Sequence, residues 1–135
     1  MKKLLLGLML LLSVGAFADH HTDGPYEYQE EMLENNFEIN KKVLTDGKVD
    51  LGDIDYDLDI YDDGVMVKLD IEPTFGKSDS WENFNKETFD KLMAEMVAEI
   101  RNELGKKDIP VTVSVELEKR MSDSEEVVYN KTFKN

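Results

Sequence analysis

Acidic residues at alternate positions are the side chains of this chain best placed to do chemistry. Asp55, Asp57 and Asp59 alternate with apolar residues in the run IDYDLDI, and Asp70 and Glu72 follow in a second alternating run. Carboxylate oxygens are the ligands that Ca²⁺ prefers, and a row of them also attracts the lysines and arginines of a protein partner. We therefore expect these five residues to bind Ca²⁺ or a basic protein segment, unless the acids serve solubility alone.

A second candidate site lies close to the amino terminus. If a peptidase cuts after Ala18, the chain begins Asp19-His20-His21, with a free amine on Asp19 and an imidazole at the third position. This tripeptide resembles the amino-terminal copper and nickel site of albumin-type proteins. There the amine, two backbone amides and the third imidazole supply four nitrogens in a plane, the geometry that Cu(II) and Ni(II) prefer. The resemblance implies Cu or Ni binding here, and a cut one residue away would remove the site.

The chain offers few of the residue types that enzymes use for catalysis. The chain has no cysteine, and His20 and His21 are its only histidines. No glycine-rich phosphate loop, HExxH or GxSxG motif occurs. The common catalytic pairs of a nucleophile and a positioned base therefore cannot be assembled from recognisable motifs. A pair of carboxylates could still act as acid and base in a hydrolase. Because 30 acidic residues bring some pair together by chance, we predict a protein that is not an enzyme.

The amino-terminal segment predicts export from a bacterial cell. Two lysines precede the apolar run 4–12, and Ala16-Phe17-Ala18 is a small-x-small cleavage site, so residues 1–18 fit a secretory signal peptide. The run is shorter than the about 20 apolar residues that span a bilayer. We expect the mature protein to function in the periplasm or outside the cell, with no stable insertion into the membrane.

The charge balance excludes one class of partner. The chain carries 30 acidic and 16 basic residues, and loss of two lysines with the leader would leave 14 bases and a net charge of −16. Binding to phosphates requires clustered lysine and arginine, so we expect no nucleic-acid partner. Metal cations and basic protein segments are the partners that this charge favours.

Alternating patterns predict a β-hairpin in the first half of the chain. Apolar and acidic residues alternate over 53–60 and largely over 65–72, the period-2 signature of half-buried strands. An Asp-Gly pair between two such runs is a strong hairpin signal. A turn at Asp63-Gly64 would place Asp57 opposite Asp70, and a turn at Asp62-Asp63 would keep the same residues on the same faces.

Helical and alternating patterns complete the predicted order. Apolar spacing indicates one helix over 26–44 and a longer one over 79–104, which opens with a capping box formed by Asp79 and Glu82. Alternation predicts two further strands, over 109–117 and 127–133.

The order α-β-β-α-β-β predicts an α+β fold. We expect a flexible segment at 19–25 and a single domain over 26–135, with a four-stranded, mainly antiparallel sheet and helices packed on one face. A free edge of this sheet could pair with another copy of the chain. The sequence therefore predicts a small exported binding domain that uses its acidic sheet face or a cleft between helix and sheet.

Overall fold

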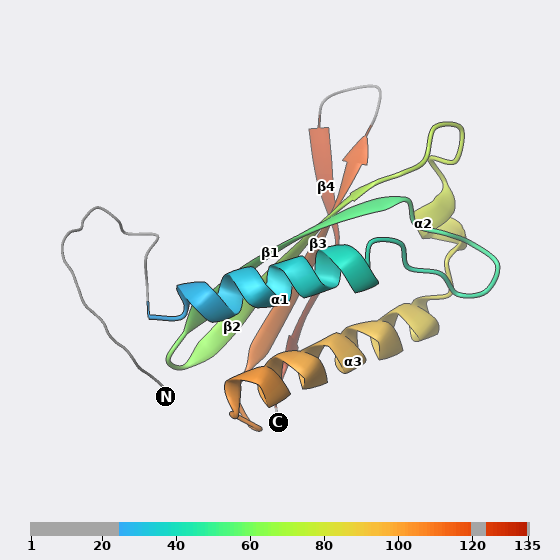
Figure 1. The fold of residues 1–135 in the computed structure, drawn as a ribbon. Helices are drawn as coiled ribbons and strands as arrows, with labels where there is room; N and C mark the ends of the chain where they lie inside the picture. Colours follow the sequence, from blue (N-terminus) through green and yellow to red (C-terminus); the bar gives the residue numbers. More distant parts are fainter. Residues whose placement is uncertain (1–24, 120–123, 135) are drawn as a thin grey trace.

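The computed structural model describes residues 25–119 and 124–134, in which three helices accompany a four-stranded sheet (Figure 1). The elements follow the predicted order, with one short helix added. They are α1 (Glu27–Asn40), β1 (Asp53–Tyr61), β2 (Gly64–Glu72), α2 (Ser80–Asn83), α3 (Lys86–Leu104), β3 (Val111–Lys119) and β4 (Ser124–Phe133). No helix in these described ranges has the length and apolar character needed to cross a membrane.

The four strands form one mixed sheet in the order β1-β2-β3-β4. β1 pairs with β2 and β3 pairs with β4 in antiparallel fashion, whereas β2 and β3 run parallel. Parallel neighbours need a crossover connection, and the segment that contains α2 and α3 provides it. Figure 1 shows α1 and α3 on the same side of the sheet. The predicted architecture, mainly antiparallel with helices on one face, is confirmed.

The hairpin turn lies one residue earlier than the Asp-Gly pair suggests. Asp62 and Asp63 form the turn, and the glycine that follows pairs with the last residue of β1 instead of taking a left-handed conformation. Asp55 therefore lies opposite Asp70, and the predicted pairing of Asp57 with Asp70 is wrong. The shift moves every partner by two positions, which is why the predicted faces are still correct.

The long predicted helix is interrupted near its start. Phe84 has extended backbone angles, and α3 begins only after Asn85, whose side chain accepts a hydrogen bond of 2.8 Å from the Thr88 N–H. The predicted capping box is wrong, because Asp79 makes no side-chain cap to α2. Asparagine is among the best N-cap residues, so the helix restarts where Asn85 can cap it. The first helix is also shorter than predicted and ends at Asn40.

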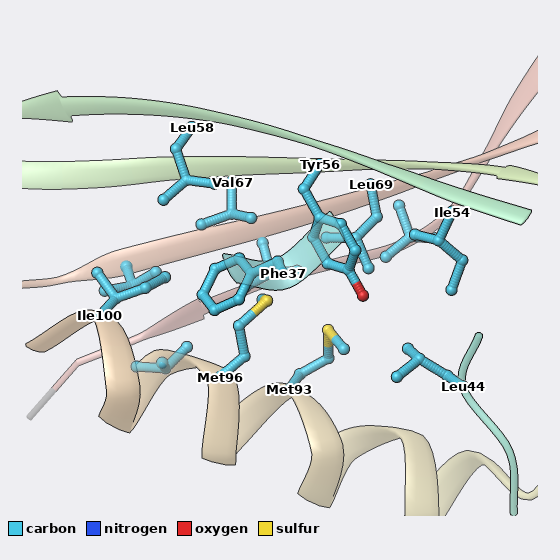
Figure 2. Packing of buried hydrophobic residues seen from close by; sticks show 14 of the residues in the cluster. Phe37, Leu44, Ile54, Tyr56, Leu58, Val67, Leu69, Met93, Met96 and Ile100 are labelled. Atoms are coloured by element: carbon cyan, nitrogen blue, oxygen red, sulfur yellow. The ribbon is translucent and has the colours of Figure 1, made fainter. Parts of the chain in front are cut away.

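The core fills the space between the sheet and the two longer helices. Figure 2 shows Met93 and Met96 projecting from α3 toward the strands, with Phe37 of α1 and Tyr56 of β1 beside them. All four side chains are buried, and the Phe37 and Tyr56 rings lie 5.4 Å apart. The apolar stripe of α3 is therefore core. Phe89 extends this core by edge-to-face contacts with other aromatic rings, namely Trp81, Phe84 and Tyr129.

Three glutamates of α1 close the outer edge of the sheet at β1. Glu30, Glu34 and Glu38, called the edge glutamates below, recur every four residues and so share one side of the helix. Their carboxylates accept hydrogen bonds of 2.7, 2.8 and 3.0 Å from the backbone N–H groups of Ile60, Leu58 and Tyr56. α1 thus takes the place of a fifth strand and opposes pairing of another copy at β1. No described strand pairs with the outer edge of β4.

Candidate functional site

The candidate site is the face of the sheet that the helices leave uncovered, called the open face below. Along β1 and β2 most apolar side chains are buried and the alternating polar ones are solvent-accessible, as the sequence predicts, whereas Tyr61 and Met66 are exposed. The strand register places polar side chains of β3 and β4 beside the accessible polar side chains of β1 and β2. The acidic residues of the open face are Asp53, Asp55, Asp57, Asp59, Asp70, Glu72, Glu116, Glu118 and Glu125. Among the described residues of the four strands, Lys68 is its only basic side chain.

Asp70 lies at the centre of the open face. Asp55 is directly opposite it on β1 and Glu116 is directly opposite it on β3, so three carboxylates form one row across three strands. The Oδ1 atom of Asp70 is shielded from water and has no hydrogen-bond partner among the described residues. Loss of hydration raises the pKa of Asp70; Lys68 opposes this effect, and the charges of Glu116 and Asp55 add to it. The ionised form of Asp70 is therefore held in unfavourable surroundings.

Three carboxylates converge where β2, β3 and β4 lie side by side. One oxygen each from Asp70, Glu116 and Glu125 lies within 4.8 Å of the others. A hydrogen bond between the two glutamates raises the pKa of Glu125 and lowers that of Glu116, so Glu125 takes up a proton first. The Lys68 Nζ lies 3.5 Å from Glu116 Oε1 and gives partial neutralisation. Such a group of oxygens suits a hard divalent cation or an ammonium group.

A lysine that follows the end of α1 meets the acids at the β1 edge. The Lys42 Nζ lies 3.2 Å from Glu38 Oε1 and 3.6 Å from a carboxylate oxygen of both Asp53 and Asp55. The hydrogen bond to Glu38 raises the pKa of Lys42, and the acids around it act in the same direction. One lysine at this edge leaves the remaining carboxylates of the open face largely uncompensated.

The structure brings some of the predicted site residues together and separates others. Asp55 and Asp70 are direct neighbours, whereas Asp57 and Asp59 continue along β1 away from the carboxylate group. Glu72 lies opposite Asp53 at the other end of the hairpin. The predicted Cu or Ni residues, Asp19, His20 and His21, lie outside the described residues, and that site stays a prediction.

Sequence reasoning missed Glu116 and Glu125. The alternation of Glu116 with buried valines of β3 was visible, but the alternation carries no information on which strand lies beside which. Only the parallel pairing of β2 with β3 brings Glu116 to Asp70.

A cleft of about 750 Å³ opens at the end of the sheet beside α2, and it is called the end cleft below. Residues before and within α2 line one side, and the last residues of β3 and the first of β4 line the other. Its apolar lining residues are Pro73, Trp81, Leu117, Val127 and Val128, and its charged ones are Glu82, Glu118, Lys119 and Glu126. This is a cleft between a helix and the sheet, of the kind that the sequence predicts as an alternative binding surface.

Fold and surface together define a small α+β domain with one open, strongly acidic sheet face. No model of a known protein family matches the sequence, and no curated protein is significantly similar to it. The class of protein therefore rests on the geometry alone. In the described ranges there is no histidine or cysteine, so acidic groups dominate whatever chemistry the surface offers.

Proposed function

We propose that this protein is a small exported, non-catalytic binding domain whose open face binds a positively charged protein segment. The observation that carries the proposal is the charge imbalance of the open face, where the described strands supply nine carboxylates and one lysine, and Lys42 adds one more cation at the β1 edge. Aspartate is a poor strand former, and like charges placed opposite each other destabilise a sheet. A basic partner would relieve this repulsion between carboxylates, and that relief would favour binding.

The row of aspartates on β1 suggests the form of the partner. Alternate residues of a strand are about 6.8 Å apart, so Asp53, Asp55, Asp57 and Asp59 present charges at a regular spacing. An extended segment with lysine or arginine at every second position has the same spacing. Such a segment lying along the open face could bring each of its cations next to one carboxylate of the row.

A peptide-binding experiment tests the proposal. A short labelled peptide of alternating lysine and serine should bind, and binding should weaken as salt rises toward about 150 mM, where the Debye length is about 8 Å. Exposed ion pairs contribute about 0.5–1 kcal/mol each, so Asp55→Asn with Asp57→Asn should weaken binding about 5- to 30-fold. Fluorescence anisotropy would measure both effects.

The matched control removes the same charge from elsewhere on the surface. Glu95 and Glu103 are exposed residues of α3, which covers the opposite face of the sheet. Glu95→Gln with Glu103→Gln should change binding less than twofold. If this variant and the Asp55/Asp57 variant bind the peptide equally, the open face is not the binding site.

A second candidate function is binding of a divalent cation, favoured by the convergence of Asp70, Glu116 and Glu125. A ligand that binds only the folded state stabilises it by about 2.7 kcal/mol at a hundredfold excess over Kd. Ca²⁺ should then raise the melting temperature, and Glu116→Gln should abolish the increase. An equal increase with NaCl of the same ionic strength would show screening of repulsion rather than a metal site.

A further inference from the structure

We infer that the end cleft binds an apolar side chain of the same basic segment that the open face binds. This inference rests on the proposed function and adds to it a second contact with a different chemistry. The partner would then be an extended basic segment with one apolar anchor near its end.

The lining of the end cleft fits an apolar side chain. Trp81 is only 8% exposed and lines the cleft together with Pro73 from the segment after β2. Leu117 of β3 and Val128 of β4 are half-buried on the opposite wall. The volume of about 750 Å³ lies within the range of about 300–1,000 Å³ that is typical of ligand sites. An aliphatic or aromatic side chain entering here would gain apolar contacts on both walls.

An irregularity in β4 shapes one wall of the end cleft. Val115 of β3 pairs with Tyr129, and the next residue, Glu116, pairs with Val127, so Val128 is an extra residue in β4. A β-bulge of this kind redirects the side chains around it and is common beside binding sites. Here it places two consecutive valines, one exposed and one half-buried, at the cleft.

The charges at the end cleft select the occupant. Among the described lining residues, Glu82, Glu118 and Glu126 stand against one base, Lys119, whose Nζ lies 3.4 Å from Glu126 Oε1. This described part of the lining is therefore negative overall. It would repel a fatty acid or an acidic peptide and would favour an apolar side chain flanked by lysine or arginine.

The end cleft is continuous with the open face. Glu118 lines the cleft and also belongs to the open face, two residues along β3 from Glu116. Two residues of a strand span about 6.6 Å. A segment that follows the open face past the Asp70, Glu116 and Glu125 carboxylates thus reaches the end cleft within one or two of its own residues.

The single tryptophan of the chain provides a direct test, because Trp81 lines the end cleft and no other tryptophan contributes emission. The probes are two lysine–serine peptides that differ at one position near the end, which holds either serine or p-bromophenylalanine. Bromine quenches indole fluorescence on contact. We expect the bromo peptide to bind about tenfold more tightly and to quench Trp81, and the serine peptide to leave the emission unchanged.

A variant that fills the end cleft separates the two contacts. Ser78 is exposed and lines the cleft, and Ser78→Phe should remove the tenfold advantage and the quenching without changing the affinity of the serine peptide. Equal melting temperatures would show that the variant folds. Glu82→Gln, which keeps the shape of the lining and removes one charge, should weaken the bromo peptide more than the serine peptide.

Each result supports or overturns a defined part of the inference. Equal binding of both peptides with unchanged Trp81 emission would overturn the cleft and leave the open-face proposal standing. Failure of both peptides to bind would overturn the proposed function itself. Quenching by the bromo peptide without any binding of the serine peptide would show that the cleft acts alone, and the shared segment would be wrong.

Discussion

The edge glutamates give the sharpest prediction on stability, and Glu34 is the best position to test it. Its carboxylate accepts a hydrogen bond of 2.8 Å from the Leu58 N–H, at an edge that would otherwise be unpaired. Partial burial raises the pKa of Glu34, and the bond to Leu58 opposes this effect, while the charges of Asp57 and Glu30 add to it. Glu34 therefore contributes a favourable hydrogen bond and an unfavourable charge.

These two contributions separate in a pair of substitutions. Hydrogen bonds to charged groups contribute about 1.5–3 kcal/mol, and water that reaches this partly exposed edge reduces the loss, so Glu34→Ala should lower the free energy of unfolding by about 1–2 kcal/mol. Glu34→Gln keeps an oxygen that accepts the Leu58 N–H and removes the charge. Glu34→Gln should therefore raise or lower the free energy of unfolding by less than about 0.5 kcal/mol.

Urea unfolding followed by Trp81 fluorescence would measure both free energies. Glu31→Ala is the matched control. Glu31 is an exposed residue of α1, three positions before Glu34, and its substitution by alanine changes helix propensity and charge in the same way. It should be neutral or slightly stabilising. If Glu34→Ala and Glu31→Ala have the same midpoint and slope, the hydrogen bonds to the β1 edge do not stabilise the fold and the reasoning is refuted.

Three further predictions follow from the same structure. Alanine at all three edge glutamates should expose the β1 edge and increase concentration-dependent self-association in sedimentation velocity relative to the wild-type protein. Lowering the pH from 7 to about 5 should raise the melting temperature. Glu34, Asp70 and Glu125 have raised pKa values, so they hold protons more tightly in the folded chain than in the unfolded one. Stability is therefore gained as the pH falls through these pKa values. A melting temperature that stays constant or falls as the pH is lowered would contradict this. Gly52→Ala should cost about 2–4 kcal/mol, because Gly52 has φ of +104° and an added Cβ would lie 2.4 Å from a backbone oxygen. Gly47→Ala, with φ of +95° and no atom near the added Cβ, should cost only about 1–2 kcal/mol.

The faces of the sheet were predictable because alternation depends only on neighbouring residues. The acidic alternation of β1 places Asp55 and Asp57 on the open face whichever turn closes the hairpin. The register was less predictable, since it depends on whether glycine or aspartate occupies the turn. In the structure Gly64 pairs in the strand, and the hairpin shifts by two positions.

Contacts between distant segments could not be predicted from these patterns. Glu116 reaches Asp70 only because β3 inserts beside β2 in parallel, a choice made by packing of the whole core. The edge glutamates are a similar case, because Glu30 and Glu34 at a spacing of four residues also fit a solvated helix face. Their role depends on α1 lying along β1, which appears only in three dimensions.

The acidic residues of this protein thus divide into two groups with opposite relations to the fold. The edge glutamates accept backbone N–H donors and support the sheet, whereas Asp70 on the open face has an oxygen with no described donor and a raised pKa. Asp70→Asn keeps the shape and removes the charge, so it should raise the free energy of unfolding at pH 7 by up to about 1 kcal/mol. The same substitution should weaken binding of the lysine–serine peptide, because it removes a central carboxylate. A gain in stability coupled to a loss in binding is the pattern expected of a functional surface. A surface kept only for solubility would show the gain alone.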